Sequence, residues 1–245
     1  LVEAEQLAKD GKAKEAEAAF RQVVEEATRS LGAEHPFTLR NRMGLARLVG
    51  DGGRPAEAVK ELRSALSTQV RVLGADHDET MITRDSLVIM LRAQGQVAEA
   101  EAEAAEQELQ FRALIKSQTQ KLGPEHPETL RRRSDLGVAL FSQGRYAEAE
   151  TEHRTVSRLM EQALGPEHPD TLMSRHNLAA ALLPLGKSAE AEAVFRAVLA
   201  IRKIVLGPEH PDTLSTWSNA ASALNSQGKN TDAEAELRKI LNIRE

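Results

Sequence analysis

Nine residues, LGPEHPDTL, run from Leu164 to Leu172 and return unchanged from Leu206 to Leu214. Three variants precede them: LGAEHPFTL from Leu31, LGADHDETM from Leu73 and LGPEHPETL from Leu122. The five motif histidines are separated by 42, 49, 42 and 42 residues. Self-similarity at a period of this size is typical of stacked supersecondary units. A catalytic site would occur once, so we expect the function to lie in the surface that stacking creates.

A second marker, a glycine followed within a few residues by a run rich in alanine and glutamate, recurs in phase with the first. The glycines are Gly11, Gly53, Gly95, Gly144, Gly186 and Gly228. The two markers predict about six units, approximately residues 1–31 (partial), 32–73, 74–122, 123–164, 165–206 and 207–245. Unit 74–122 holds seven extra residues between Gly95 and Leu122. Seven residues make about two helical turns, so we expect a longer helix whose apolar face stays on the core.

Each unit reads as two helices. In unit 165–206, Leu178 and Leu182 stand at a helical interval, and Gly186 predicts the end of the first helix. Pro169 suits its start, where a missing N–H costs nothing. The second helix, from Lys187 to Leu206, has its apolar residues on one stripe. No segment of the sequence reads as a strand, so the predicted fold class is all-α.

Composition and charge exclude several functions. The net charge of -5 and the pI of about 5.9 argue against nucleic-acid binding, which needs a basic face. The chain has no cysteine, and therefore no disulfide or thiolate metal site, which fits a cytoplasmic protein. No apolar stretch has membrane-spanning length. No phosphate loop, nucleophile triad or metal-spaced cluster is visible in the sequence. We expect no enzyme activity, no cofactor, no metal and no membrane partner.

A family resemblance rests on Leu178-Ala179 in the first helix, Ala191 near the start of the second, and GPEHPDTL followed by SRHNLA. With the period of 42 residues, these features resemble the tetratricopeptide repeats of kinesin light chain, and bacterial, actinobacterial-looking arrays more closely still. The resemblance covers essentially the whole chain. It implies a right-handed superhelical solenoid of about six helix-turn-helix repeats, whose concave groove is lined by first helices and binds peptides or proteins. Bacterial arrays of this kind often follow a nucleotide-binding switch domain of the STAND type and act as its sensor.

The groove face can be located by counting from each motif histidine. Positions +5, +8, +9, +12 and +15 share one face of the first helix, because spacings of three, four and seven superimpose. By the resemblance, positions +8 and +9 form an asparagine pair that hydrogen-bonds an extended peptide backbone; here Asn177 and Asn219 keep the second asparagine. The candidate groove-binding residues are Arg40, Met43, Arg47, Asp85, Arg92, Arg131, Ser134, Asp135, His176, Asn177, Ser218 and Asn219.

Four of these candidates are arginines, Arg40, Arg47, Arg92 and Arg131. The five predicted first helices sum to a charge of +3, although the chain carries -5. A cationic groove within an acidic shell favours an anionic ligand, so we expect the partner to be an acidic protein or peptide segment. In the alternative interpretation, the arginines lie over apolar surface or pair with glutamates of nearby second helices.

Two further repeated features favour structural roles. The motif histidines belong to different units, so we expect them to act within their loops and not to bind metal. Position +7 holds Arg42, Arg84, Arg133, Arg175 and finally Trp217. We expect the arginines to contact the preceding unit and the tryptophan to pack. Residues 50–53 (GDGG) and Pro184, which break the repeat, are hinge candidates.

The sequence therefore predicts a protein- or peptide-binding module that serves as the sensor or scaffold part of a larger bacterial regulator. Two alternatives stay open. One is a structural module that self-associates end to end through uncapped terminal units, in which Leu1–Phe20 and Ala233–Ile243 fray first when they are unpartnered. The other is an accessory part of an enzyme whose catalytic residues lie elsewhere.

Overall fold

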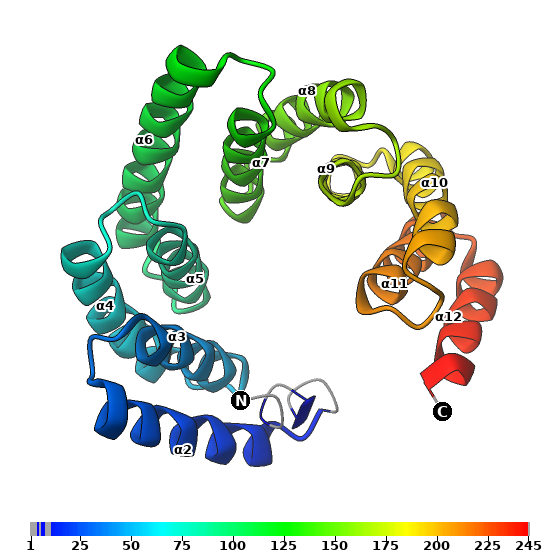
Figure 1. The fold of residues 1–245 in the computed structure, drawn as a ribbon. Coiled ribbons are helices and arrows are strands. Elements are labelled where there is room, and N and C mark those ends of the chain that lie inside the picture. The colour runs from blue at the N-terminus through cyan, green and yellow to red at the C-terminus, as the bar shows by residue number, and fades with distance from the viewer. Residues whose placement is uncertain (1–3, 5, 8–10, 245) are drawn as a thin grey trace. The chain divides into compact units, whose positions relative to one another are not determined.

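The computed structural model describes residues 4, 6–7 and 11–244 of the chain, and these residues contain helices and no strand (Figure 1). The chain forms two compact units, Leu1–Gln110 and Phe111–Glu245. The helices are α2 (Ala13–Leu31), α3 (Pro36–Asp51), α4 (Pro55–Val72), α5 (Asp78–Ala93), α6 (Val97–Leu122), α7 (Pro127–Ser142), α8 (Tyr146–Leu164), α9 (Pro169–Leu182), α10 (Ser188–Val205), α11 (Pro211–Ser226) and α12 (Asn230–Arg244). The predicted all-α class is confirmed.

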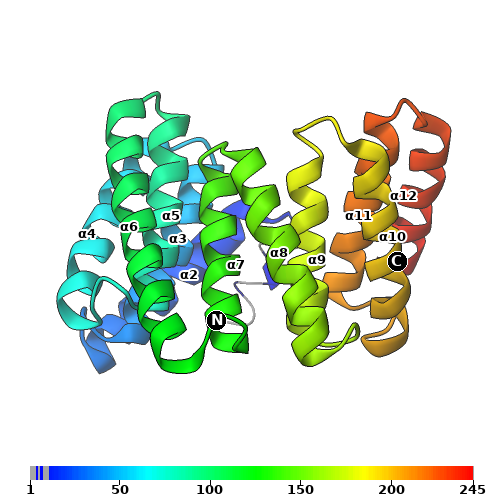
Figure 2. The ribbon, with the colours of Figure 1, turned by 90° about the horizontal axis from the view of Figure 1, so that it is seen from above.

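Helices pack as pairs within each unit. In the second unit, each helix from α7 to α11 contacts the next helix along the chain, and α7 also contacts α9. The first helices α7, α9 and α11 form one layer and the second helices α8, α10 and α12 form the other (Figure 1). Figure 2 shows neighbouring helices of this unit side by side. In the first unit, α3 contacts α2, α4 and α5. First helices of successive repeats therefore touch one another along one face.

The nine-residue motif forms the corner at which each first helix begins. Its histidine is the N-cap: Nδ1 accepts the N–H of the residue two positions later, at 3.1–3.2 Å in all five copies. Its glycine adopts φ between +91° and +100°, where any other residue would be strained. In three copies, the threonine hydroxyl donates to the carbonyl of that glycine at 2.8–2.9 Å. The predicted structural role of the histidines is confirmed.

The second marker forms the other corner of each repeat. All six of its glycines have φ between +74° and +85°. The alanine five residues later is buried in every copy, and these alanines are Ala16, Ala58, Ala100, Ala149, Ala191 and Ala233. A methyl group at this position lets the second helix approach the first closely. The alanine-rich runs are therefore the tight seams between paired helices.

Three departures from the period have visible results. The seven extra residues lengthen α6 to 26 residues, against 18 or 19 in α4, α8 and α10. Pro184 shortens α9 to 14 residues, against 16 in the other first helices. Gly50 lies inside α3, where an added Cβ would stand 3.2 Å from the Cβ of Ala58. Close packing therefore explains this glycine, and the hinge role stays a prediction.

Three of the arginines at +7 pair with glutamates of the second helix in the same repeat: Arg42 with Glu61, Arg84 with Glu103 and Arg133 with Glu152, at 3.0, 3.2 and 2.8 Å. The sequence analysis did not predict these pairs. Arg84 and Arg175 also line cavities together with residues of the second helix of the preceding repeat, α4 and α8, which agrees with the predicted contact. The packing role of Trp217 is confirmed, since it is buried against Leu199, Leu214 and Ile240.

The prediction that Leu1–Phe20 and Ala233–Ile243 fray first stays a prediction. Positions 1–3, 5 and 8–10 of the first segment lie outside the described residues. Ala4, which is described, is buried.

Gly137 in α7 gives room to a buried histidine of α8. The side chain of His153 is 1% exposed, and an added Cβ at Gly137 would stand 2.6 Å from its Cε1 and 2.8 Å from its Nε2. Burial lowers the pKa of His153 to about 4, so the ring is neutral at physiological pH. α7 and α8 therefore approach closely only because position 137 has no side chain.

Gly137→Ala should destabilise the protein. Alanine inside a helix ordinarily stabilises by about 1 kcal/mol relative to glycine. Here the methyl overlaps a buried ring, and overpacking of this kind costs about 1–3 kcal/mol. We expect a net loss of up to about 2 kcal/mol and a lower Tm, measured by thermal and urea unfolding. In a His153→Ala background the ring is gone, so the same substitution should stabilise; a loss of equal size in both backgrounds would contradict this account.

Candidate functional site

Four of the seven predicted groove residues of the second unit line a cavity of about 400 Å³ between α7 and α9. Its lining residues are Arg131, Ser134, Asp135, Val138, Met160, Asp170, Met173 and Asn177. We call it the groove cavity. Four of the eight, Arg131, Ser134, Asp135 and Asn177, are predicted groove residues. Helical periodicity brings them together because the two first helices lie side by side with the same face outward.

Two polar side chains in the groove cavity are available to a ligand. The hydroxyl of Ser134 and the amide of Asn177 make no hydrogen bond with any described residue, and both side chains are half-buried. An asparagine amide offers a donor and an acceptor side by side. A peptide group offers the matching acceptor and donor. Asn177 can therefore hold an extended backbone without breaking any contact with the described protein.

Apolar residues complete the groove cavity. The side chains of Val138 and Met173 are each 42% exposed, while Met160 of α8 is buried beneath them. Sequence reasoning missed these residues, although Val138 stands at +12 and Met173 at +5, both on the groove face. Their positions in the groove columns could have identified them, but the predicted groove residues are polar or charged, with Met43 as the single apolar member.

Ion pairs neutralise part of the groove charge. Arg131 Nη2 lies 3.3 Å from Asp170 Oδ2, and Arg40 Nε donates to Glu79 Oε1 at 2.8 Å. Both acids stand two residues after the motif histidine of the next repeat, in the first turn of its first helix, where a negative charge also complements the helix dipole. The pairing that the alternative interpretation predicted with second helices does not hold for these two arginines. Asp135 faces Arg132 at 3.4 Å.

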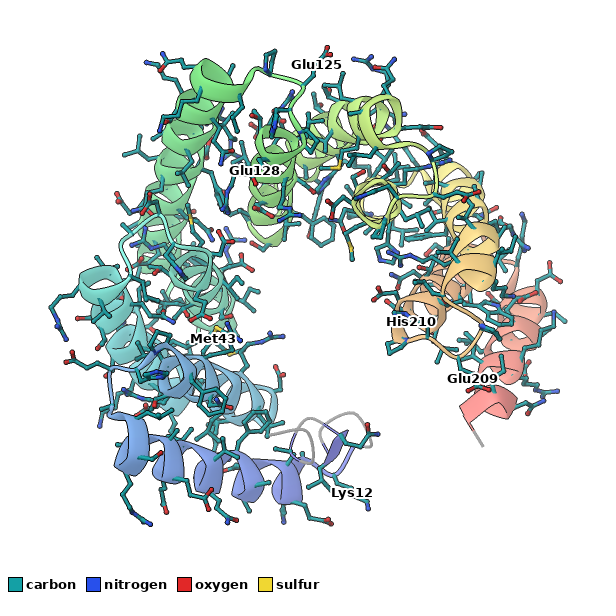
Figure 3. All side chains as sticks on the ribbon, in the orientation of Figure 1. Lys12, Met43, Glu125, Glu128, Glu209 and His210 are labelled. Atoms are coloured by element: carbon teal, nitrogen blue, oxygen red, sulfur yellow. The ribbon has the colours of Figure 1, made fainter. Side chains whose placement is uncertain are left out.

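The candidates of the first unit lie on two first helices, α3 and α5. Met43 of α3 lies beside α5, where its sulfur accepts the hydroxyl of Thr83 at 3.3 Å (Figure 3). Arg47 is exposed and forms no ion pair with a described carboxylate. Asp85 and Arg92 are half-buried, and each has a polar partner.

His176 and Asn219, both predicted to face a ligand, instead contact each other. Asn219 Nδ2 lies 3.2 Å from His176 Nε2, and His176 Nδ1 lies 3.2 Å from the hydroxyl of Thr216. That hydroxyl donates to the carbonyl of Asp212 and accepts from Arg202. It can therefore only accept from Nδ1–H, which assigns a neutral ring whose Nε2 accepts from the asparagine. The amide donor of Asn219 is thus already used inside the protein.

Burial, and to a smaller extent the positive charge of Arg202, lower the pKa of His176 to about 4, because the opposing effect of Asp212 is smaller than that of Arg202. The ring also packs edge-on against Phe195, with centroids 5.2 Å apart. The neighbouring candidate Ser218 is half-buried and has no hydrogen-bond partner in the described part of the chain. His176 therefore holds α9 to α11 and contributes less to the groove surface than predicted.

Among the described residues, no group of three or more histidine, aspartate or glutamate side chains could hold a metal ion. No helix in the described part of the chain is long and apolar enough to cross a membrane.

Comparisons with known proteins agree with this architecture. The model of the tetratricopeptide repeat family matches residues 3–68, 133–204 and 176–245. The chain is similar to a putative kinesin light chain of Podosopora anserina with nearly identical TPR-like repeats. A structure of a single-residue variant of that protein gives a TM-score of 0.54 and 29% identity over 84% of this chain and 94% of that chain. A second structure of that protein gives a TM-score of 0.52 and 29% identity over 86% of this chain and 96% of that chain.

BtubC (BKLC) from P. vanneervenii shares the fold, with a TM-score of 0.53 and 17% identity over 95% of this chain and 91% of that chain. The search of curated proteins found no match. The predicted resemblance to kinesin light chain-like tetratricopeptide arrays is confirmed.

Acidification should destabilise the protein through His153 and His176. Both have a native pKa of about 4, whereas an unfolded histidine titrates near 6.5. Below pH 6.5 the unfolded chain binds protons that the native protein excludes, so their stabilisation is complete above pH 6.5 and is lost as the pH falls towards 4. Each should contribute a decline of up to about 1.4 kcal/mol per pH unit. Urea unfolding between pH 7.5 and 5 measures this slope. His176→Gln should reduce it, and an unchanged slope would show that the histidine is not responsible.

Proposed function

The chain belongs to the tetratricopeptide repeat family, whose arrays mediate protein–protein interactions, and we propose that it binds an extended polypeptide segment across α7 and α9. The observation that carries this proposal is the groove cavity, where the available groups of Ser134 and Asn177 adjoin the exposed side chains of Val138 and Met173. Polar groups would fix the backbone, and the apolar surface would receive a side chain. Binding sites commonly combine a few placed polar groups with an apolar lining.

We still propose an acidic segment as the ligand, although the groove has less unpaired positive charge than the sequence suggested. The lining of the groove cavity has no surplus of positive charge, because it holds one arginine, Arg131, and two aspartates, Asp135 and Asp170. Arg131 pairs with Asp170, and Asp135 pairs with Arg132 outside the lining. The pair of Arg131 and Asp170 is exposed, and exposed pairs contribute about 0–1 kcal/mol, so an acidic ligand residue could take over Arg131 at little cost. Arg47 supplies an exposed positive charge on the first unit.

The wider role that we propose is the sensor or scaffold part of a larger bacterial regulator in the cytoplasm, without catalytic activity of its own. The repeat architecture supports this role, because the same helix face recurs with different residues in each repeat and so forms an extended surface that suits a long partner. Assaying the parent protein with ATP, with and without this region, would separate a sensor from an accessory part of an enzyme.

Self-association is a second candidate, favoured by one observation. Leu237 and Leu241 of α12 are 45% and 57% exposed. They stand four residues apart and so share a helix face. Apolar faces of this kind are typical of contact surfaces.

Asn177→Ala should weaken peptide binding with little effect on stability. The suitable ligand is a peptide selected on the protein from a random library, and calorimetry would measure its Kd. Loss of the backbone hydrogen bonds should cost about 1 kcal/mol, a five- to tenfold higher Kd. Asn219→Ala is the matched control: it breaks the contact with His176 and should lower Tm. An unchanged Kd in Asn177→Ala, or a selected peptide that contacts only α8 and α10, would contradict the proposal.

Reversing the charge of Arg40, Arg47 and Arg131 together should weaken binding of an acidic peptide and flatten its salt dependence. Exposed charges are screened over about 8 Å at physiological ionic strength, so the wild-type Kd should rise as salt is added. Titrations at two salt concentrations measure the difference. If the Kd of the wild-type protein does not change with salt, the proposal that the ligand is acidic is wrong, whereas the proposal that the groove binds a polypeptide is unaffected.

Leu237→Glu and Leu241→Glu together should abolish self-association if α12 mediates it. Light scattering over a range of protein concentrations would then show a lower mass for the variant than for the wild type. A wild-type protein that is monomeric at all concentrations would exclude this second candidate.

A further inference from the structure

One repeat lacks half of an ion pair that three others have. The second-helix position +26 from the motif histidine holds a glutamate in four repeats, Glu61, Glu103, Glu152 and Glu236, and a valine, Val194, in the remaining one. The partner at +7 is still an arginine in that repeat, Arg175. The α9–α10 repeat has therefore kept the cation and lost the anion.

Arg175 is left without a partner in the described part of the chain. It is half-buried, yet no described residue forms a hydrogen bond or an ion pair with it. The equivalent Arg133 donates to Glu152 through Nε at 3.0 Å and through Nη2 at 2.8 Å. A half-buried guanidinium without a counter-ion loses hydration and gains nothing in return. An external anion would supply what the repeat lacks.

The side chain of Arg175 opens into a cavity of about 470 Å³ on the second-helix side of this unit. Its lining residues are Arg154, Thr155, Ser157, Arg158, Glu161, Arg175, Leu178 and Val194. We call it the outer cavity. It is formed by α8, α9 and α10, of which α8 and α10 belong to the layer opposite the first helices (Figure 1). It shares no residue with the groove cavity.

A corresponding cavity in the first unit shows which group the arginine at this position normally contacts. It measures about 540 Å³ and is formed by α4, α5 and α6, with Arg63, Arg84 and Leu87 at the positions of Arg154, Arg175 and Leu178. There Glu103 occupies the place of Val194. Its carboxylate lies 3.2 Å from Arg84 Nε. Within this fold, the natural partner of the arginine is thus a carboxylate on a short aliphatic stem.

The remaining charges of the outer cavity favour an anion. Arg154 is neutralised by Glu150 and Glu190, at 2.7 and 2.8 Å. Arg158 donates only to the amide of Gln162, at 3.3 Å, among the described residues. Besides Arg154, the lining of the outer cavity thus holds two guanidinium groups, Arg158 and Arg175, and one carboxylate, Glu161, which leaves a surplus of positive charge.

We propose that the outer cavity binds a glutamate side chain of a partner polypeptide, whose carboxylate takes the place that Glu103 occupies in the corresponding cavity. Guanidinium and carboxylate groups match as paired hydrogen bonds, which favours this ligand over a spherical anion. Leu178 and Val194 provide an apolar wall for the aliphatic stem of the glutamate. The proposal is independent of the groove, because it concerns other residues on another face.

The first test places the missing carboxylate in the chain itself. Val194→Glu should restore the pair with Arg175, and Val194→Gln is the matched uncharged control. Thermal unfolding at low salt should show the glutamate variant melting about 2–4 °C above the glutamine variant, a difference that disappears in an Arg175→Met background. If Val194→Glu and Val194→Gln have equal melting temperatures in the protein that retains Arg175, a carboxylate at position 194 does not pair with Arg175, and the proposal is overturned.

The second test measures binding directly. A helical peptide rich in alanine and glutamate, its glutamine counterpart and N-acetylglutamate amide would be titrated into the protein, while NMR follows the Nε–Hε signals of Arg158 and Arg175. We expect saturable shifts with the glutamate peptide, at least a tenfold weaker effect with the other two, and no shift in Val194→Glu. Asn177→Ala should bind normally, which separates this site from the groove.

Three results would contradict the proposal: no shift with the glutamate peptide, a shift that persists in Val194→Glu, or equal binding of the glutamine peptide. Saturation by N-acetylglutamate amide as tight as by the peptide would assign the cavity to a small carboxylate and overturn the polypeptide partner.

Discussion

The histidine-capped corner is the constraint on which the other features depend. A glycine with positive φ turns the chain, the histidine imidazole accepts the first free N–H of the new helix, and in three copies a buried threonine joins the corner back to the glycine carbonyl. These contacts fix the residue at which the first helix starts. Since a helix advances 100° per residue, fixing the start also fixes which positions face the groove, the second helix and the next repeat.

Because the framework is repeated, each copy serves as a reference for the others, and departures become informative. Arg42, Arg84 and Arg133 all find a glutamate on the returning helix, so the valine opposite Arg175 stands out as a change in chemistry and not in packing. Likewise, Asn177 has no partner among the described residues, whereas Asn219 at the same position is held by His176. Residues that share a column therefore need not share a role.

Much of the fold could be predicted from the sequence, because glycine, proline and histidine mark the helix ends and period 3.6 marks the faces. Four of the predicted groove residues, Arg131, Ser134, Asp135 and Asn177, do line one cavity in the second unit. The partners of the arginines could not be predicted, since a long side chain reaches several acids and the choice depends on distances between helices. The contact between His176 and Asn219 was also missed, because it depends on the rotation between successive repeats, for which the sequence has no simple signal. Val194, opposite Arg175, can be read from the sequence, but its consequence depends on the ion pairs that Arg84 and Arg133 form with glutamates at the same position.

Within each unit, the helix contacts reach no farther than the next repeat. Loop closure between contacting segments therefore involves short stretches of chain, which costs little entropy and corresponds to a low contact order. Folding can begin at any helix pair and spread in either direction, without waiting for the two ends of the chain to meet. An error in one pair weakens its neighbours and leaves distant repeats intact. The array can thus change residues at one recognition surface while the folding of the other repeats continues unaffected.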